Sequence, residues 1–164
     1  MQLYVVRHAI AEDAEPGQDD SDRALSKDGK RKLRAAVRGL RALDVRFDRV
    51  LTSPKLRAIQ TATALAKLCA APPLVTPLLA QSPRNELLAQ VAELAAATKH
   101  GAAVVGHEPW LGELIALLAF GDTRFGESLA LKKAGVALLD GSAVPGGMTI
   151  QALLPPKMLR TARG

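Results

Sequence analysis

Short apolar runs alternate with amphipathic stretches along this chain. Three of the runs are only four residues long and rich in aliphatic side chains, which is typical of strands buried in a parallel sheet. They cover residues 3–6, 49–52 and 102–105. Residues 136–139 and 148–153 predict two more strands, joined by a turn that contains Pro145, Gly146 and Gly147. This last pair is compatible with a hairpin, which would make the sheet mixed.

The stretches between the strands have helical spacing. Leu33, Val37 and Leu40 recur every three or four residues and mark the buried face of a helix that Ser26 caps and that runs to about Leu43. Three further helices are expected, two opened by a serine–proline pair, with serine as N-cap and proline at the first helical position, and one by a proline. They cover residues 53–68, 82–98 and 109–119.

This alternation of strands and helices predicts an α/β protein. We expect a three-layer α/β/α sandwich around a mostly parallel central sheet. A chain of 164 residues is long enough for one substantial core, and neither an internal repeat nor a linker divides it. The sequence therefore predicts a single domain over residues 1–164.

Composition narrows the setting in which the protein works. No run of about 18 apolar residues exists, so we expect no membrane span. The first eight residues, MQLYVVRH, lack the basic leader of a signal peptide, and Cys69 is the only cysteine. A lone cysteine without an export signal favours the cytoplasm.

The formal net charge of +6 favours an anionic partner or simply keeps the chain soluble. The five aromatic residues do not interleave with a basic stretch, so no stacking platform for nucleic acid is predicted. One concentration of charge lies on the helix after Ser26, where Arg31, Arg34, Arg38 and Arg41 fall away from the buried face. These arginines form either a solvated face or a docking face for an acidic protein.

Three motifs follow the three central strands. They are Arg7-His8, the segment from Ser53 to Arg57, and Gly106-His107-Glu108-Pro109. Because ligands of open α/β sheets bind outside the carboxyl ends of the strands, we expect two arginines and two histidines to meet there. Helix N-termini at the same edge would also favour an anion.

These side chains suit phosphoryl transfer. Arg7 and Arg57 offer planar, permanently charged groups that bind phosphoryl oxygens bidentately. A neutral imidazole is a nucleophile near pH 7, so one histidine can attack phosphorus and become a phosphohistidine. The other histidine, protonated or as a neutral donor, can stabilise the charge of the transition state. This scheme needs neither a metal ion nor a cofactor.

In these motifs the chain resembles the histidine phosphatase superfamily, also called phosphoglycerate mutase-like. The segment SPKLRAIQTA at residues 53–62 matches the superfamily's arginine motif most closely. The resemblance spans the chain, and its short form is similar to the bacterial phosphohistidine phosphatases of the SixA type. It implies that His8 is the nucleophile, that Arg7 and Arg57 bind phosphate, and that His107 is the second histidine of the pocket.

Two departures from the superfamily's usual pattern matter. Its Arg-His-Gly is Arg7-His8-Ala9 here, and alanine resists some backbone angles that glycine permits. The inserted lobe that carries a general acid in larger members is also missing. Four carboxylates lie nearest to the motifs in sequence, and none is assigned as that acid. They are Glu12, Asp13, Glu86 and Glu108.

The missing acid suggests a substrate. An alkoxide leaving group needs an acid, whereas the imidazole of a phosphohistidine leaves more readily. We therefore expect hydrolysis of phosphohistidine on a partner phosphotransfer protein, which an open site would admit. One alternative is a broad phosphomonoesterase acting on small metabolites, and another is an inactive module that binds phosphoproteins. The sequence does not specify the partner or the oligomeric state.

Overall fold

The computed structural model describes residues 1–69 and 71–162 and contains a mixed, six-stranded sheet with the order β3-β2-β4-β1-β5-β6. The first four strands in this order are parallel, whereas β5 is antiparallel to β1 and β6 to β5. The predicted hairpin of the last two strands is thereby confirmed. The strands are β1 Gln2–Arg7, β2 Arg49–Thr52, β3 Leu74–Val75, β4 Ala102–Gly106, β5 Val136–Gly141 and β6 Met148–Leu154.

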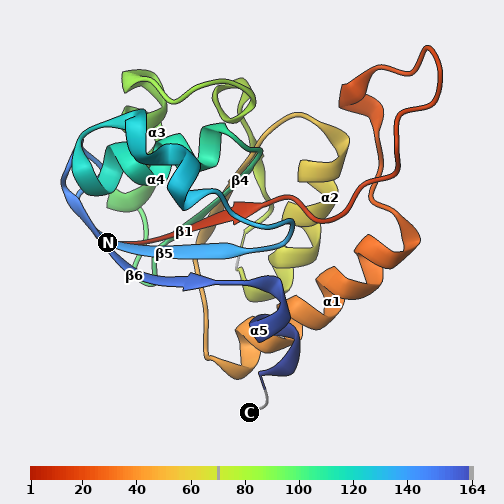
Figure 1. Ribbon diagram of the computed structural model, residues 1–164. Helices are drawn as coiled ribbons and strands as arrows, with labels where there is room; N and C mark the ends of the chain where they lie inside the picture. Colours follow the sequence, from red (N-terminus) through yellow and green to blue (C-terminus); the bar gives the residue numbers. More distant parts are fainter. Residues whose placement is uncertain (70, 163–164) are drawn as a thin grey trace.

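Helices cover both faces of the sheet, which confirms the predicted α/β class and its three layers (Figure 1). One face carries α1 Lys27–Ala42, α2 Leu56–Leu65 and α5 Pro156–Thr161. The other carries α3 Asn85–Ala96 and α4 Trp110–Phe120. Between β2 and β4 the described chain forms no separate lobe. The described residues also form four short 3₁₀ helices: η1 Asp20–Asp22, η2 Ala66–Leu68, η3 Pro77–Ala80 and η4 Thr123–Leu129.

The two faces of β1 supply two separate cores. Because side chains alternate along a strand, Tyr4 and Val6 pack toward α1 and α2, whereas Leu3 and Val5 pack toward α3 and α4. On the first side, Gly39 lets α1 and α5 meet closely, since a Cβ atom there would overlap the carbonyl oxygen of Leu159. The sheet is thus fixed on both faces, which holds its strand ends in place.

Helix starts were predicted with mixed success. Ser26 caps α1 as expected, because its Oγ accepts a hydrogen bond from the Gly29 N–H at 2.9 Å. The prediction that Ser53 caps the second helix is wrong: α2 begins at Leu56 with Lys55 as its N-cap residue. Ser82 does not open α3 either, which begins at Asn85, and its hydroxyl donates to Glu113 of α4 instead. In the described part of the chain, no helix is both long and apolar enough to cross a bilayer.

Candidate active site

The carboxyl ends of three strands bring the two histidines and Arg57 together. His8 directly follows β1, and its backbone N–H donates to the Gly106 carbonyl at the end of β4 at 3.1 Å. His107 follows Gly106, so its ring lies beside that of His8 with 5.0 Å between the centroids. Arg57 in the first turn of α2 donates from Nε to His8 Nε2 at 3.4 Å.

The hydrogen bonds of His8 define its tautomer. Nδ1 lies 2.7 Å from the Ala9 carbonyl oxygen, which can only accept, so Nδ1 carries the proton. Nε2 accepts from Arg57 and therefore holds a lone pair. The nitrogen with nucleophilic character is thus the one that faces the guanidinium group.

His8 is neutral at physiological pH. Burial, together with the positive charges of Arg57, Arg7 and Lys133, lowers its pKa to about 4, although the Ala9 carbonyl acts in the opposite direction. Its side chain is therefore ready to attack an electrophile without first losing a proton.

His107 is also neutral, and Ser53 orients it. Burial, together with the neighbouring His8 and Arg57, lowers the pKa of His107 to about 3. Its Nε2 lies 2.8 Å from the Ser53 Oγ, which accepts from the Lys55 N–H. If the Ser53 hydroxyl donates to Nε2, the ring proton resides on Nδ1, a buried atom without a hydrogen-bond partner among the described residues. Of the two states left open by the sequence, the structure favours the neutral donor.

Arg57 is held by a residue that the sequence analysis did not single out. Its NH1 donates to the Asp20 carbonyl at 2.6 Å, and its NH2 to the Asp20 carboxylate at 2.9 Å. The same carboxylate accepts from Lys55 Nζ at 2.8 Å. These partners hold the pKa of Asp20 well below its usual range, so the group is ionised. A carboxylate therefore lies against the cations expected to bind a phosphoryl group.

Arg7 lies at the same strand end, and the loop that contains Leu131 fixes it. Its NH1 donates to the Leu131 carbonyl at 2.6 Å, while its buried Nε has no hydrogen-bond partner among residues 1–69 and 71–162. Glu108 holds this loop, since its carboxylate accepts from the N–H groups of Leu131 and Gly112. Burial raises the pKa of Glu108. Its place in the structure is that of an anchor between the loop and α4.

The alanine after His8 fits its place. Among the described residues, positive φ at non-glycine positions occurs at Asp44 and Ala134, so Ala9 adopts an ordinary backbone conformation. The Ala9 N–H donates to Thr61 Oγ1, whose hydroxyl donates to the Arg57 carbonyl. Glycine is therefore not required at this position.

The other candidate acids do not contact the site in the described structure. Glu12 and Asp13 lie exposed in the loop before η1, and Glu86 is exposed in the first turn of α3. The acidic loop also contains Asp20, which does reach the site from 37 residues away in sequence. No local pattern distinguishes Asp20 from its acidic neighbours, so only the path of the loop reveals it.

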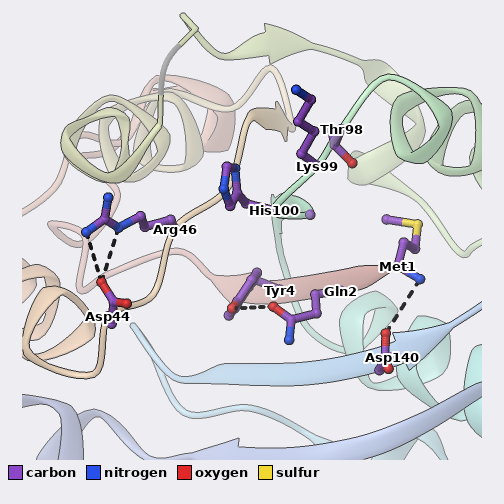
Figure 2. Close-up of a pocket in the computed structure, with 10 residues that line it drawn as sticks. Met1, Gln2, Tyr4, Asp44, Arg46, Thr98, Lys99, His100 and Asp140 are labelled. Carbon is purple, nitrogen blue, oxygen red and sulfur yellow. Dashed lines mark hydrogen bonds and ion pairs between the residues drawn. The ribbon is translucent and has the colours of Figure 1, made fainter.

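A separate cavity lies at the opposite end of the sheet. Its volume is about 740 Å³, and it opens at the amino ends of β1 and β4. Figure 2 shows that its charged groups largely neutralise one another: Arg46 pairs with Asp44, and the Met1 ammonium with Asp140. His100 is likewise bound, to Asp48 at 3.0 Å. His8, His107 and Arg57 lie at the carboxyl ends of the strands and do not line this cavity.

The two buried histidines predict an acid-labile fold. In the unfolded chain they bind protons near pH 6.5, but in the folded protein only near pH 4 and pH 3. Acidification from pH 6.5 to 4 therefore favours unfolding, by about 1.4 kcal/mol per pH unit for each histidine. Urea unfolding between pH 7 and 4.5 should show a steeper loss of stability in the wild type than in the double variant His8→Ala/His107→Ala. Glu108 acts in the opposite direction in both proteins, and parallel curves would contradict the prediction.

Comparisons with known proteins agree with this geometry. Residues 3–82 match the family model of the histidine phosphatase superfamily (branch 1). The chain is 33% identical over 126 residues to the phosphohistidine phosphatase SixA of Escherichia coli K12, covering 75% of this chain and 77% of that protein. It is 38% identical over 145 residues to an uncharacterized protein of Picosynechococcus, covering 87% of each. The structure of the protein histidine phosphatase SixA in complex with tungstate superposes with a TM-score of 0.81 at 27% identity, over 97% of this chain and 99% of that one.

Proposed function

Because this chain belongs to the histidine phosphatase superfamily, we propose that it hydrolyses phosphohistidine on a partner phosphotransfer protein, through a phosphohistidine intermediate on His8 and without a metal ion. The observation that carries this proposal is the state of His8. Its Nδ1 proton is bound by the Ala9 carbonyl, and its Nε2 lone pair faces Arg57 at 3.4 Å. A neutral, oriented imidazole beside a guanidinium group is suited to attack a phosphoryl group.

The reaction proceeds in two displacements. First, the Nε2 lone pair of His8 forms a bond to phosphorus while the P–N bond to the partner's imidazole breaks. The leaving nitrogen keeps the electron pair and takes a proton from water. Then a water oxygen attacks phosphorus, the electron pair returns to Nε2, and the water gives its proton to solvent. Inorganic phosphate leaves, and neutral His8 is restored.

The surrounding groups stabilise charge during both steps. Arg57 and Arg7 bind the peripheral oxygens of the phosphoryl group, which carry negative charge throughout. The His107 Nδ1–H, which has no hydrogen-bond partner among the described residues, donates to one of these oxygens. Ser53 fixes the ring that presents this proton.

The carboxylates favour a P–N over a P–O substrate. Asp20 is ionised because Lys55 and Arg57 bind it, so it has no proton to give to a leaving alkoxide. Glu108 is occupied by two backbone N–H groups. Without a general acid, hydrolysis that expels an alkoxide loses a rate factor of about 10²–10⁴. The imidazole of a phosphohistidine leaves more readily, with water as the proton source.

A substrate panel tests this proposal. We expect kcat/KM to be higher for a phosphorylated histidine phosphotransfer domain and for free phosphohistidine than for small sugar phosphates. Faster turnover of the sugar phosphates would favour a phosphomonoesterase instead. Binding of the phosphoprotein without any turnover would point to an inactive binding module.

Asp20 is expected to compete with the phosphoryl group for Arg57 and Lys55. Its side chain is 48% exposed, so it can move aside when a substrate enters. Asp20→Asn removes the competing charge, and tungstate or phosphate should then inhibit at concentrations about 3- to 10-fold lower. Asp22→Asn is the matched control, since Asp22 lies in the same 3₁₀ turn but makes no ion pair within the described structure. Weaker inhibition of the Asp20→Asn variant would show that the carboxylate helps anion binding.

A further inference from the structure

The helices α1 and α2 lie on the same face of the sheet (Figure 1). A furrow is lined by residues of both helices. It comprises three adjoining cavities of about 270, 380 and 350 Å³. Arg34, Ala64 and Lys67 line both the first and the second cavity, and Arg41 and Lys67 line both the first and the third. The three cavities therefore form one continuous feature, which we call the α1–α2 furrow.

The rim of the α1–α2 furrow is strongly positive. Six cationic side chains line it. One of them, Arg46, pairs with Asp44 at the third cavity. The other five make no ion pair with a carboxylate in the part of the chain that is described. They are Lys30, Arg34, Arg38, Arg41 and Lys67. The one acidic residue of α1, Asp28, pairs with Arg31 and Lys32 outside the furrow. The first two cavities thus carry positive charge with no carboxylate among their described lining residues.

The spacing of the arginines makes this arrangement unfavourable in the free protein. Arg34, Arg38 and Arg41 follow one another at intervals of four and three residues, so they lie along one stripe of α1. Like charges at this spacing destabilise a helix. Arg41 does donate to the Lys67 carbonyl at 3.3 Å, but that bond neutralises no charge. An acidic ligand in the furrow would relieve the repulsion.

The floor between these cations is apolar, because Val37 and Ala64 line the first cavity, which adjoins the other two. We propose that the α1–α2 furrow binds an acidic amphipathic helix of the phosphoprotein substrate, an inference that rests on the proposed function. Glutamates or aspartates of that helix pair with the cationic rim, and its apolar stripe covers the floor. From Lys30 to Arg41 the furrow spans about 16 Å, the length of a three-turn helix.

The position of the furrow suits a substrate protein. The end of the furrow near the start of α1 is lined by Leu25 and Gln60, and the Leu25 N–H donates to Gln60 Oε1 at 2.7 Å. Gln60 lies one helical turn after Arg57 on α2. A helix seated in the furrow would therefore point one end toward the histidines. A phosphohistidine near that end could reach His8 while the helix stays bound.

The chemistry of the lining favours a protein over a nucleic acid. A phosphate backbone needs cations but gains nothing from an apolar floor, and single-stranded bases need aromatic rings for stacking. No aromatic side chain lines any of the three cavities among the described residues. A small phosphorylated metabolite is too short to contact cations spread along the furrow.

Charge reversal in the furrow tests this inference in two assays. The first measures binding of a fluorescent peptide of about 15 residues, with a leucine–alanine stripe flanked by glutamates at i, i+4. The second compares kcat/KM for a phosphorylated histidine phosphotransfer domain with that for free phosphohistidine. The test variant is Arg34→Glu/Arg38→Glu. The control is Lys157→Glu/Arg160→Glu, which changes the net charge equally at two exposed positions of α5 that do not line the furrow.

We expect the furrow variant to bind the peptide about tenfold more weakly, and its kcat/KM for the phosphoprotein to fall similarly. Turnover of free phosphohistidine should be unchanged, and the control should match the wild type in both assays. Equal losses in both double variants, or tighter binding of a short DNA duplex than of the peptide, would overturn the inference. If the wild type binds the peptide but hydrolyses no P–N substrate, the proposed function fails and the furrow does not.

Discussion

Replacing His8 by alanine is expected to abolish turnover while leaving the fold intact. The variant loses the Nε2 lone pair that faces Arg57, and water would have to attack the substrate directly. Removing the nucleophile of a covalent mechanism lowers kcat by about 10⁴- to 10⁶-fold. The measurement is single-turnover hydrolysis of phosphohistidine, with thermal unfolding recorded alongside.

The matched control for this prediction is His100→Ala. His100 is exposed at the opposite end of the sheet and is bound to Asp48, away from the strand ends where His8 and His107 meet. Its loss should leave kcat within about twofold of the wild type, as for most surface changes. Turnover that survives in His8→Ala would remove His8 from the mechanism, whatever the control shows.

Replacing Arg57 by alanine is expected to have the second-largest effect. Arg57 contacts Nε2 of His8, the proposed nucleophile, and is the guanidinium group expected to bind the phosphoryl oxygens. Loss of one such preorganised donor lowers kcat by about 10²–10³-fold. Arg57 should also bind the phosphoryl oxygens in the ground state. Tungstate should therefore inhibit the Arg57→Ala variant more weakly than the wild type.

Arg57→Lys separates charge from geometry. A lysine keeps the positive charge but cannot donate to His8, to the Asp20 carbonyl and to the Asp20 carboxylate in one plane, as Arg57 does. We therefore expect it to recover tungstate binding more than kcat. A folded Arg57→Ala variant, as judged by circular dichroism, with a kcat near that of the wild type would contradict the role of Arg57 in binding the phosphoryl group.

The parts of the fold predictable from sequence were those with a repeated or local signal. The aliphatic runs at residues 3–6 and 102–105 became β1 and β4, and Ser26 capped α1 as its position indicated. Two short elements were missed, β3 at Leu74–Val75 and α5 at Pro156–Thr161. Two or six residues are too few to show a periodic pattern of hydrophobic side chains. The position of β3 depends on its pairing with β2, and that of α5 on its packing against α1.

The site shows the same division between local and long-range information. His8 and His107 meet because each follows a central parallel strand, a placement that the sequence pattern already indicated. Ser53 was interpreted as a helix cap from its local pattern. Its hydroxyl instead lies 2.8 Å from His107, which is 54 residues away in sequence. Asp20 could not be found, because its contact with Arg57 depends on how the loop before α1 folds back.

The central claim, that His8 carries the phosphoryl group during turnover, is tested most directly by trapping the phosphoenzyme. The protein is mixed with a ³²P-labelled phosphohistidine substrate, quenched within milliseconds in alkali, and digested for mass spectrometry. If His8 is the nucleophile, the label is stable in alkali, lost in acid, located on His8, and absent from the His8→Ala variant. A label on any other residue, or turnover in which phosphate appears without a labelled protein at any quench time, would contradict it.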